Sequence, residues 1–227
     1  FSEGLAAVRV GSKWGFTNKE GKIIIKPQFD YATLFHEGLS AVRMGDKWSF
    51  INKKGDYIIE PQFSMVNDFF KDQAAFNIGG SMDGDGRISG GKWGFINKEG
   101  KIIIEPQFTR VNDFLEDLAA FNIGGSMGIN ERISGGKWGF IDRENIIIIK
   151  PQFDWASEFK EGLAYIKIED KSGSINKEGK YAIYPRFDEI RDFCECLAAI
   201  EIDIKWGFIN KEDKIIIQTL FDDANDF

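Results

Sequence analysis

A motif that recurs six times along the chain limits the fold more than any other feature of this sequence. Its clearest copy spans residues 92–108 and has the sequence KWGFINKEGKIIIEPQF. The tryptophan position of the motif recurs at spacings of 34, 45, 45, 34 and 34 residues, and holds Trp14, Trp48, Trp93, Trp138, Ser172 and Trp206. Regular spacing of this kind is typical of repeat architectures, in which each repeat is one supersecondary unit packed on its neighbours.

Each copy contains three segments that predict β-strands. In residues 5–10 the side chains alternate with a period of two, which predicts a strand with one apolar face. In residues 13–18, Trp14 and Phe16 share a face, while Gly15 leaves room for another backbone or ring to approach closely. The Trp-Gly pair recurs in nearly every copy, so we expect it to be structural: Trp14, Trp48, Trp93, Trp138, Trp206, Gly15, Gly94, Gly139 and Gly207.

The third segment, residues 23–29, is apolar on both faces in its first half, which predicts a strand covered on both sides. Pro27 lacks an N–H group, so the end of this strand should lie at a sheet edge or leave the sheet. The turn before it predicts a tight hairpin with a left-handed residue, because its fourth position holds residues that tolerate a positive φ. Those residues are Gly21, Gly55, Gly100, Asn145, Gly179 and Asp213.

A short linker joins each copy to the next. Its first position holds residue types that cap helices, namely Asp30, Ser64, Thr109, Asp154, Asp188 and Asp222. The linker is therefore predicted to form either a single helical turn or a short, irregular fourth strand. Its expected buried positions are Ala32, Val66, Val111, Ala156, Ile190 and Ala224.

These segments predict an all-β protein of six antiparallel, three- to four-stranded repeat units. A β-propeller-like ring is favoured, because the second and third strands are apolar on both faces and the number of periods is integral. An open β-solenoid or superhelical array is the alternative, since 34 residues is short beside the roughly 40–45 of familiar propeller blades. We expect one domain over 1–227, with units at about 1–34, 35–68, 69–113, 114–158, 159–192 and 193–227. Because Phe1 is not a start methionine, we expect a fragment of a longer protein.

The motif Lys-Trp-Gly-Phe-Ile-Asn-Lys-Glu-Gly-Lys, followed by isoleucines, Pro-Gln-Phe and Glu-Gly-Leu-Ala, resembles the WG (KWG) repeat family over the entire chain. Two copies depart from it. The fifth has Ser172 and Ser174 in place of both aromatic residues, and the last has Thr219 and Leu220 for Pro-Gln. The resemblance implies a bacterial β-repeat protein. An accessory repeat domain of a larger multidomain bacterial protein is one alternative for its function. It implies no single activity and no functional residue.

Composition argues against several classes of function. The net charge of −7 argues against nucleic acid as a partner, which requires a basic surface. No apolar run reaches the length of a membrane span. His36 is the only histidine, and Cys194 and Cys196 are the only cysteines, so we expect a surface histidine and two ordinary thiols. We therefore expect no enzyme, no metal and no cofactor.

Copies three and four each carry eleven extra residues, within the glycine-rich segments 79–91 and 124–136. They predict flexible loops or extended hairpin tips that project side by side from one face. Asp83 and Asp85 resemble the start of a calcium loop but lack its later ligands, so a polar tip is the favoured interpretation. On a ring, the lysines before the tryptophan position would form a circle of charge able to attract an anion. The favoured interpretation is that each lysine lays its stem over neighbouring aromatics and points to solvent. These lysines are Lys13, Lys47, Lys92, Lys137, Lys171 and Lys205.

The leading hypothesis is a non-enzymatic protein-binding or scaffold module that displays the two long loops. Its candidate binding residues are Met82, Asp83, Asp85, Arg87, Met127, Asn130 and Arg132. The alternative is a carbohydrate or cell-wall binding module, in which Tyr31 and Trp155 stack on sugars. The scarcity of histidine and cysteine argues against a third hypothesis, an enzyme site hosted on the repeats.

Overall fold

The computed structural model describes residues 1–128, 132–191, 193 and 196–224, and these residues form β-strands and no helix. Accordingly, no described helix has the length and apolarity needed to cross a membrane. The chain divides into two compact units, Phe1–Asp113 with Ile123–Gly135, and Phe114–Asn122 with Gly136–Phe227. Each is described by itself below, and whether they form the one predicted domain, as a ring or an open array, stays a prediction.

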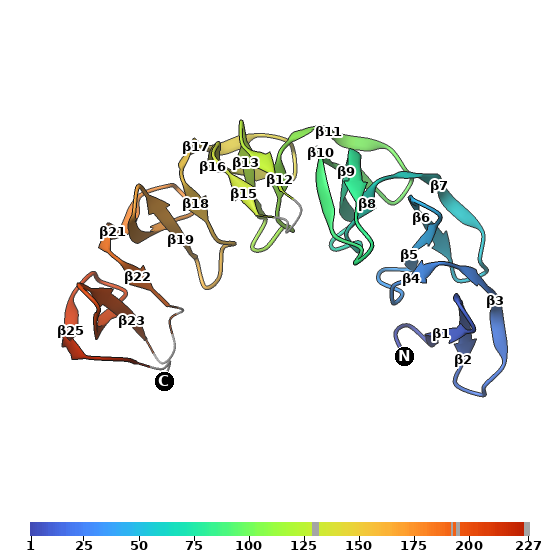
Figure 1. Cartoon of the computed structure of the whole chain (residues 1–227), viewed down its shortest axis with the longest axis horizontal. Helices are drawn as coiled ribbons and strands as arrows, with labels where there is room; N and C mark the ends of the chain where they lie inside the picture. The colour runs from blue at the N-terminus through green and yellow to red at the C-terminus, as the bar shows by residue number, and fades with distance from the viewer. Residues whose placement is uncertain (129–131, 192, 194–195, 225–227) are drawn as a thin grey trace. The chain divides into compact units, whose positions relative to one another are not determined.

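Antiparallel sheets build the first compact unit (Figure 1). Sheet I has three strands, β1 (Leu5–Val10), β2 (Lys13–Asn18) and β3 (Ile23–Phe29). Sheet II has the order β4 (Tyr31–Ala32), β5 (Leu39–Met44), β6 (Lys47–Asn52), β7 (Tyr57–Phe63). Sheet III has the order β8 (Met65–Val66), β9 (Gln73–Met82), β10 (Ile88–Asn97), β11 (Ile102–Phe108). The strands β12 (Arg110–Val111), β14 (Ser126–Met127) and β15 (Ile133–Ser134) also belong to this unit.

The second compact unit repeats the same element. Sheet IV contains β13 (Leu118–Ile123), β16 (Lys137–Asp142) and β17 (Ile147–Phe153). Sheet V has the order β18 (Trp155–Ala156), β19 (Leu163–Ile168), β20 (Lys171–Asn176), β21 (Tyr181–Phe187). Sheet VI has the order β22 (Glu189–Ile190), β23 (Leu197–Ile202), β24 (Lys205–Asn210), β25 (Ile215–Phe221). The prediction of antiparallel repeat units with three or four strands is therefore confirmed.

The linkers form two-residue strands, so the helical alternative was wrong and the fourth-strand alternative was right. In sheet II, Tyr31 pairs with Arg43 and Ala32 with Val42, which joins the linker to the strands that follow it. Asp30 caps no helix, because its carboxylate accepts hydrogen bonds from two neighbouring sheets, as described below. The predicted buried linker positions are buried in four copies, and Ile190 and Ala224 are half-buried.

In sheets II, III and IV the first strand is buried on both faces, which corrects the prediction of one apolar face there, whereas in β1 only Leu5 is buried. In β5, residues Leu39 to Val42 are all buried. Val42 packs in a cluster with Phe16 and Ile25 of sheet I. Its neighbour Ala41 packs in another cluster with residues of sheet III such as Phe76. Sheet II therefore lies between two apolar cores, and both faces of its inner strands are desolvated.

The third strand is not covered on both sides, contrary to prediction. Ile23 and Ile24 are 44% and 39% exposed and only Ile25 is buried, because β3 lies at the edge of its sheet. The edge placement predicted from Pro27 is confirmed. The β2–β3 register pairs Trp14 with Phe29 but Phe16 with Ile25, so β3 bulges around the proline.

The turn before this strand has the predicted conformation. The Gly21 N–H donates to the Asn18 carbonyl oxygen at 3.1 Å, and the Asn18 N–H donates to the Lys22 carbonyl oxygen at 3.0 Å. All six residues at the fourth position have a positive φ, including Asn145 at 68° and Asp213 at 63°. The prediction of a tight hairpin with a left-handed residue is confirmed.

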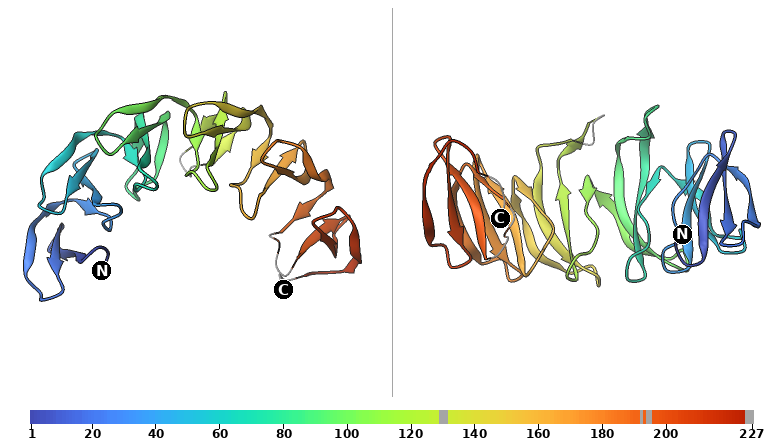
Figure 2. Two further views of the ribbon diagram at one scale, coloured as in Figure 1. Left: turned by 180° about the vertical axis from the view of Figure 1, so that it is seen from behind. Right: turned by 90° about the horizontal axis from the view of Figure 1, so that it is seen from below.

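The two insertions form hairpins on the first compact unit, so the extended-hairpin alternative holds. The long β9–β10 hairpin continues sheet III outward (Figure 2, right). In the second insertion β14 pairs with β15, and β14 lies beside β10. The predicted side-by-side placement is therefore confirmed for the part of these segments that the structure describes.

Candidate functional site

The tryptophans of the motif line the spaces between sheets. Trp48, Trp93, Trp138 and Trp206 are buried, and Trp14 is half-buried. Except at Trp48, where Ser49 follows, the next residue is a glycine that touches the bulge of the edge strand: a Cβ on Gly94 would lie 2.4 Å from the Ile104 carbonyl oxygen. The predicted close approach of backbone at this glycine is confirmed.

The linker residues pack against these indoles. Tyr31 contacts Trp14 of sheet I and Trp48 of its own sheet, with ring centroids 5.9 and 5.6 Å apart. The guanidinium of Arg110 lies 5.7 Å from the Trp93 ring. The indoles of sheets I and III thus each have a neighbour from the linker of the next sheet, and Met65 of the linker after sheet II packs on the core cluster that contains Trp48. Tyr31, a candidate for sugar stacking, has its ring engaged by two indoles although it is 45% exposed.

Sheet V departs from this arrangement at Ser172. The register aligns Trp155, Lys167 and Ser172 across three strands, as it aligns Tyr31, Arg43 and Trp48 in sheet II. The indole is missing, and Trp155 does not replace it, since its side chain is 45% exposed. A groove of about 390 Å³ remains, lined by Trp155, Ile166, Lys167, Ser172, Glu189 and Ile190 together with Tyr165.

The second aromatic residue missing from the fifth copy, at Ser174, has a counterpart on the neighbouring strand. Ser174 pairs with Tyr165 across the strands, where Ala41 pairs with Phe50 in sheet II. The large and small side chains have exchanged strands, which conserves volume. No such exchange accompanies Ser172.

Four of the six recurring lysines before the tryptophan position form ion pairs with linker aspartates. Lys13 Nζ lies 2.7 Å from Asp30 Oδ1, Lys137 Nζ lies 2.5 Å from Asp154 Oδ1, and Lys171 Nζ lies 2.5 Å from Asp188 Oδ1. Lys205 pairs with Asp222 in the same way. In these four copies the lysine is paired with the linker carboxylate, so the six lysines form no circle of free charges, and the favoured prediction that each lysine simply points to solvent is wrong for these four.

The second oxygen of these carboxylates holds the next sheet. Asp30 Oδ2 accepts the Gly45 N–H at 2.8 Å, and Asp154 Oδ2 accepts the Glu169 N–H at 2.7 Å. The hydrogen bond from the lysine, and then the one from the backbone, lower the pKa of Asp30 and Asp154 below the ordinary value. The links at Asp30, Asp154 and Asp188 therefore tie one sheet to the first turn of the following one.

Lys47 and Lys92 have no such partner among the described residues, since Ser64 and Thr109 replace the aspartate. Both replacements are buried and precede the two inserted hairpins. Thr109 Oγ1 donates to the Gly125 carbonyl oxygen at 3.1 Å in the second insertion. The long hairpins thus take the place of the short turn that an aspartate would bind.

A second set of carboxylates links sheets at their other end. Glu3 accepts the Gly38 N–H at 3.0 Å and pairs with Lys53 at 2.9 Å. Glu116 accepts the Gly162 N–H and pairs with Lys177 at 3.1 Å. These contacts are structural links within each compact unit.

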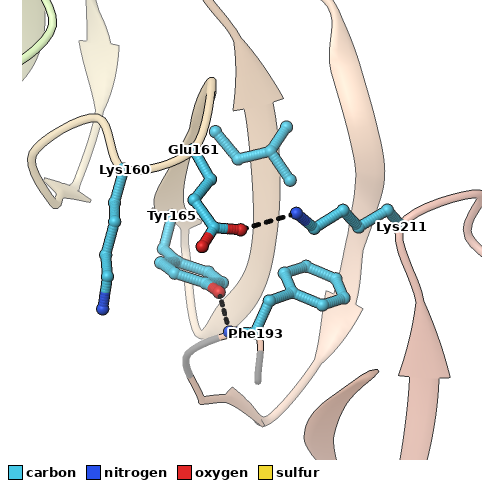
Figure 3. A pocket seen from close by; sticks show the side chains of 6 residues that line it. Lys160, Glu161, Tyr165, Phe193 and Lys211 are labelled. Atoms are coloured by element: carbon cyan, nitrogen blue, oxygen red, sulfur yellow. Dashed lines mark hydrogen bonds and ion pairs between the residues drawn. The ribbon is translucent and has the colours of Figure 1, made fainter. Parts of the chain in front are cut away.

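The close-up in Figure 3 shows a pocket at one such link. Glu161 pairs with Lys211 at 2.8 Å, and the Phe193 N–H donates to the Tyr165 hydroxyl oxygen at 2.9 Å. Its cavity of about 10 Å³ holds at most about one water molecule. This pocket is consequently a packing junction, too small for a ligand.

The hairpin tip of the first insertion uses its carboxylate internally. Asp83 Oδ1 accepts the N–H groups of Asp85 and Arg87 at 3.0 and 2.9 Å, as an Asx turn does. Among the described residues no group of three histidine, cysteine or acidic side chains could hold a metal ion. The tip is thus a turn, with Asp85 and Arg87 exposed at its end.

The other candidate residues of the insertions differ in exposure. Met82 is half-buried beside Arg43, and Met127 is buried, so neither offers a free surface. Arg132 is exposed, and Asn130 lies outside the described residues.

His36 and Cys196 are a surface histidine and an ordinary thiol, as predicted. His36 is exposed and lies 3.6 Å from Asp68. Cys196 is a free, exposed thiol, and Cys194 lies outside the described residues. The sequence reasoning missed the groove at Ser172, although the absent tryptophan was its signal.

Comparison with known proteins identifies the repeat. The family model described as "WG containing repeat" matches residues 1–14, 14–48, 48–80, 93–126, 138–171, 173–203 and 206–227. No curated protein matches the chain.

Several solved structures are similar. One titled "Crystal structure of the eukaryotic initiation factor" has a TM-score of 0.50 at 12% identity. The match covers 92% of this chain and 61% of that one, so the chain spans about three-fifths of its length. Kluyveromyces lactis Hsv2p has a TM-score of 0.48 at 11% identity, covering 92% and 71% of the two chains. The first likeness shows a propeller-like all-β fold and nothing about function.

Proposed function

The chain belongs to the family of WG containing repeats, and we propose that it is a non-enzymatic protein-binding module. Its binding surface is formed by the paired hairpins of residues 79–91 and 124–136. The sheets beneath act as a rigid scaffold, and catalysis has no part in the proposed role.

One observation carries this proposal: the hairpins lie side by side and are anchored in the core of one compact unit. β14 lies beside β10, while Ile88 and Met127 are buried at 1% and 6% exposure. Met82 packs on the core cluster that contains Trp48. Anchored hairpins lose little conformational entropy on binding, which favours affinity.

The charges around the hairpins support an acidic segment as the partner. Lys92 lies in β10 and has no carboxylate partner among the described residues, and neither does Lys47 of the preceding sheet. Arg132 is exposed on the second hairpin. Unpaired cations attract an anionic surface and raise the rate of association.

The test is to shorten both hairpins to the two-residue Gly-Asp turn that joins β5 to β6 at Gly45. We expect partner binding to fall at least tenfold while the melting temperature changes by only a few degrees. A partner first captured with the intact chain is purified, and its affinity is measured by calorimetry with both forms.

Two variants control this experiment. Arg87→Glu with Arg132→Glu keeps the buried anchors and should still weaken binding, whereas Tyr31→Ala should not. Equal affinity of the intact and shortened chains would refute the proposal.

Carbohydrate binding is the second candidate, favoured by the exposed Trp155 ring beside a groove with polar side chains. Aromatic faces of this kind stack on sugar rings. A glycan array compared between the natural chain and Trp155→Ala tests it, and the absence of any Trp155-dependent signal would remove it.

A further inference from the structure

We propose that the groove between Trp155 and Glu189 binds one aromatic side chain, above all an indole, carried by a protein partner. The inference deepens the proposed function, because the ring must come from a protein. It names a second contact site, located in sheets V and VI of the second compact unit.

The repeat itself defines the shape of the missing group. At the position of Ser172 the other sheets hold an indole, and Trp48 and Trp206 are each 6% exposed there. Such an indole lies beside the linker residue of its own sheet, as Trp48 lies beside Tyr31 at 5.6 Å. It also lies beside the next linker, as Trp14 lies beside Tyr31 with ring centroids 5.9 Å apart. In sheet V these neighbours are Trp155 and Glu189, and both line the groove.

The missing tryptophan side chain at Ser172 leaves open space, whereas the missing phenylalanine side chain at Ser174 does not. Tyr165 pairs with Ser174 across the strands, so an aromatic ring stays at that level of the sheet, carried by the neighbouring strand. Opposite Ser172 stands Lys167, and the groove of about 390 Å³ falls in the size range of ligand sites. Its floor is apolar, with Ile166 fully buried and Ile190 half-buried.

The charges at the rim complement an indole. An aromatic ring has a negative face and a positive edge, so the Lys167 ammonium can lie over the face while the Glu189 carboxylate accepts the N–H. The Ser172 hydroxyl is already used, because Oγ donates to the Asp188 carbonyl oxygen at 3.2 Å. A sugar, which needs several hydrogen bonds, is less well matched than a ring with one donor.

Binding is measured by titrating the whole chain with N-acetyl-tryptophanamide and following amide shifts in two-dimensional NMR. We expect saturable shifts of residues around Ser172 and Trp155. Ser172→Trp restores the repeat's own residue, so it should raise or preserve the melting temperature while weakening binding at least tenfold. Loss of binding in a chain of equal or greater stability cannot be attributed to unfolding.

Trp155→Ala should weaken binding as well, and Tyr31→Ala, at the equivalent position of sheet II, should leave it unchanged. Methyl glucoside and cellobiose serve as sugar probes in parallel. No saturable binding of the tryptophan probe, equal binding by Ser172→Trp, or binding of sugars alone would each overturn the inference. Failure here leaves the hairpin experiment unaffected, because that experiment changes only the first compact unit and its hairpins.

Discussion

Single residues decide how closely the strands of one sheet can approach. Gly94 faces the bulge at Pro106, where a Cβ would lie 2.4 Å from the Ile104 carbonyl oxygen and 2.9 Å from the proline nitrogen. In sheet II, Ser49 takes the equivalent place, fully buried, and its hydroxyl donates to the Val42 carbonyl oxygen at 3.2 Å. The bulge can therefore open to admit a small side chain when the sheet is built around it.

Gly94→Ala should destabilise the chain by about 1–3 kcal/mol, the usual cost of forcing an extra methyl group into a packed interior. Gly84→Ala is the matched control, because a Cβ there meets no atom within 4 Å. Urea unfolding of both variants is the measurement. Equal midpoints for the two would contradict the assigned role of Gly94.

At the scale of elements, the first and second strands of each sheet are joined by a short turn. The residues of this turn differ in how well they tolerate the positive φ that it requires. The first turn has a positive φ at Gly11 in sheet I and at Gly45 in sheet II. In sheet VI both Asp203 and Ile204 have a positive φ, at 49° and 60°, and Ile204 is 79% exposed. A β-branched residue is strained in this region, whereas Asp-Gly is a preferred pair in such two-residue hairpins.

Ile204→Gly should therefore stabilise the chain. Relief of the left-handed strain contributes roughly 1–2 kcal/mol, and the flexibility of glycine in the unfolded chain offsets about 0.5–1 kcal/mol of it. The net gain of about 0.5–1 kcal/mol should appear as a higher melting temperature. Ser12→Gly, at a position without positive φ, should lower it, and a gain from both substitutions would count against this explanation.

Within each compact unit the sheets are joined by apolar cores and by repeated carboxylate links. Phe16 packs on Phe35 and Phe140 on Phe159, with ring centroids 4.8 and 4.7 Å apart. The lysine–aspartate links add a charged contact at the sheet ends, as Lys13, Asp30 and Gly45 do between sheets I and II. The links are accessible to solvent, so each one stabilises only modestly.

These links predict a dependence of stability on acid. The folded-state pKa of Asp154 is lowered by the hydrogen bond from Lys137, so its stabilisation is complete above the unfolded pKa near 3.8. That stabilisation is lost as the pH falls through the folded pKa. Asp154→Asn should cost roughly 0.2–1 kcal/mol at pH 7, and this difference should vanish in strong acid.

Urea unfolding from pH 7 to pH 2 measures this difference, with the exposed Asp46→Asn as the control. Combining Asp30→Asn, Asp154→Asn and Asp188→Asn should enlarge the effect, because all three carboxylates have a lysine partner. A difference between Asp154→Asn and the natural chain that stays constant over the pH range would be inconsistent with the proposed links.

The sequence by itself determined the local structure of this protein. The spacing of its motif, the glycines and asparagine of its second turn and the proline of its third strand predicted the antiparallel units, the tight hairpins and the edge strand. Those features depend on backbone geometry within a few residues, so a single repeat contains the information. The sequence also placed the two insertions at equivalent points and marked Ser172 as a departure.

Only the tertiary structure decided which faces are buried and which charges are free. Alternation could not show that β5 is desolvated on both sides, because the second core comes from a neighbouring sheet. It could not pair Lys13 with Asp30, or leave Lys92 without a carboxylate partner among the residues that the structure describes, since such contacts join residues of different strands. For the same reason the sequence could not show that the missing indole leaves a groove lined by Trp155 and Glu189. The volume of that groove is set by packing between sheets and not by local propensity.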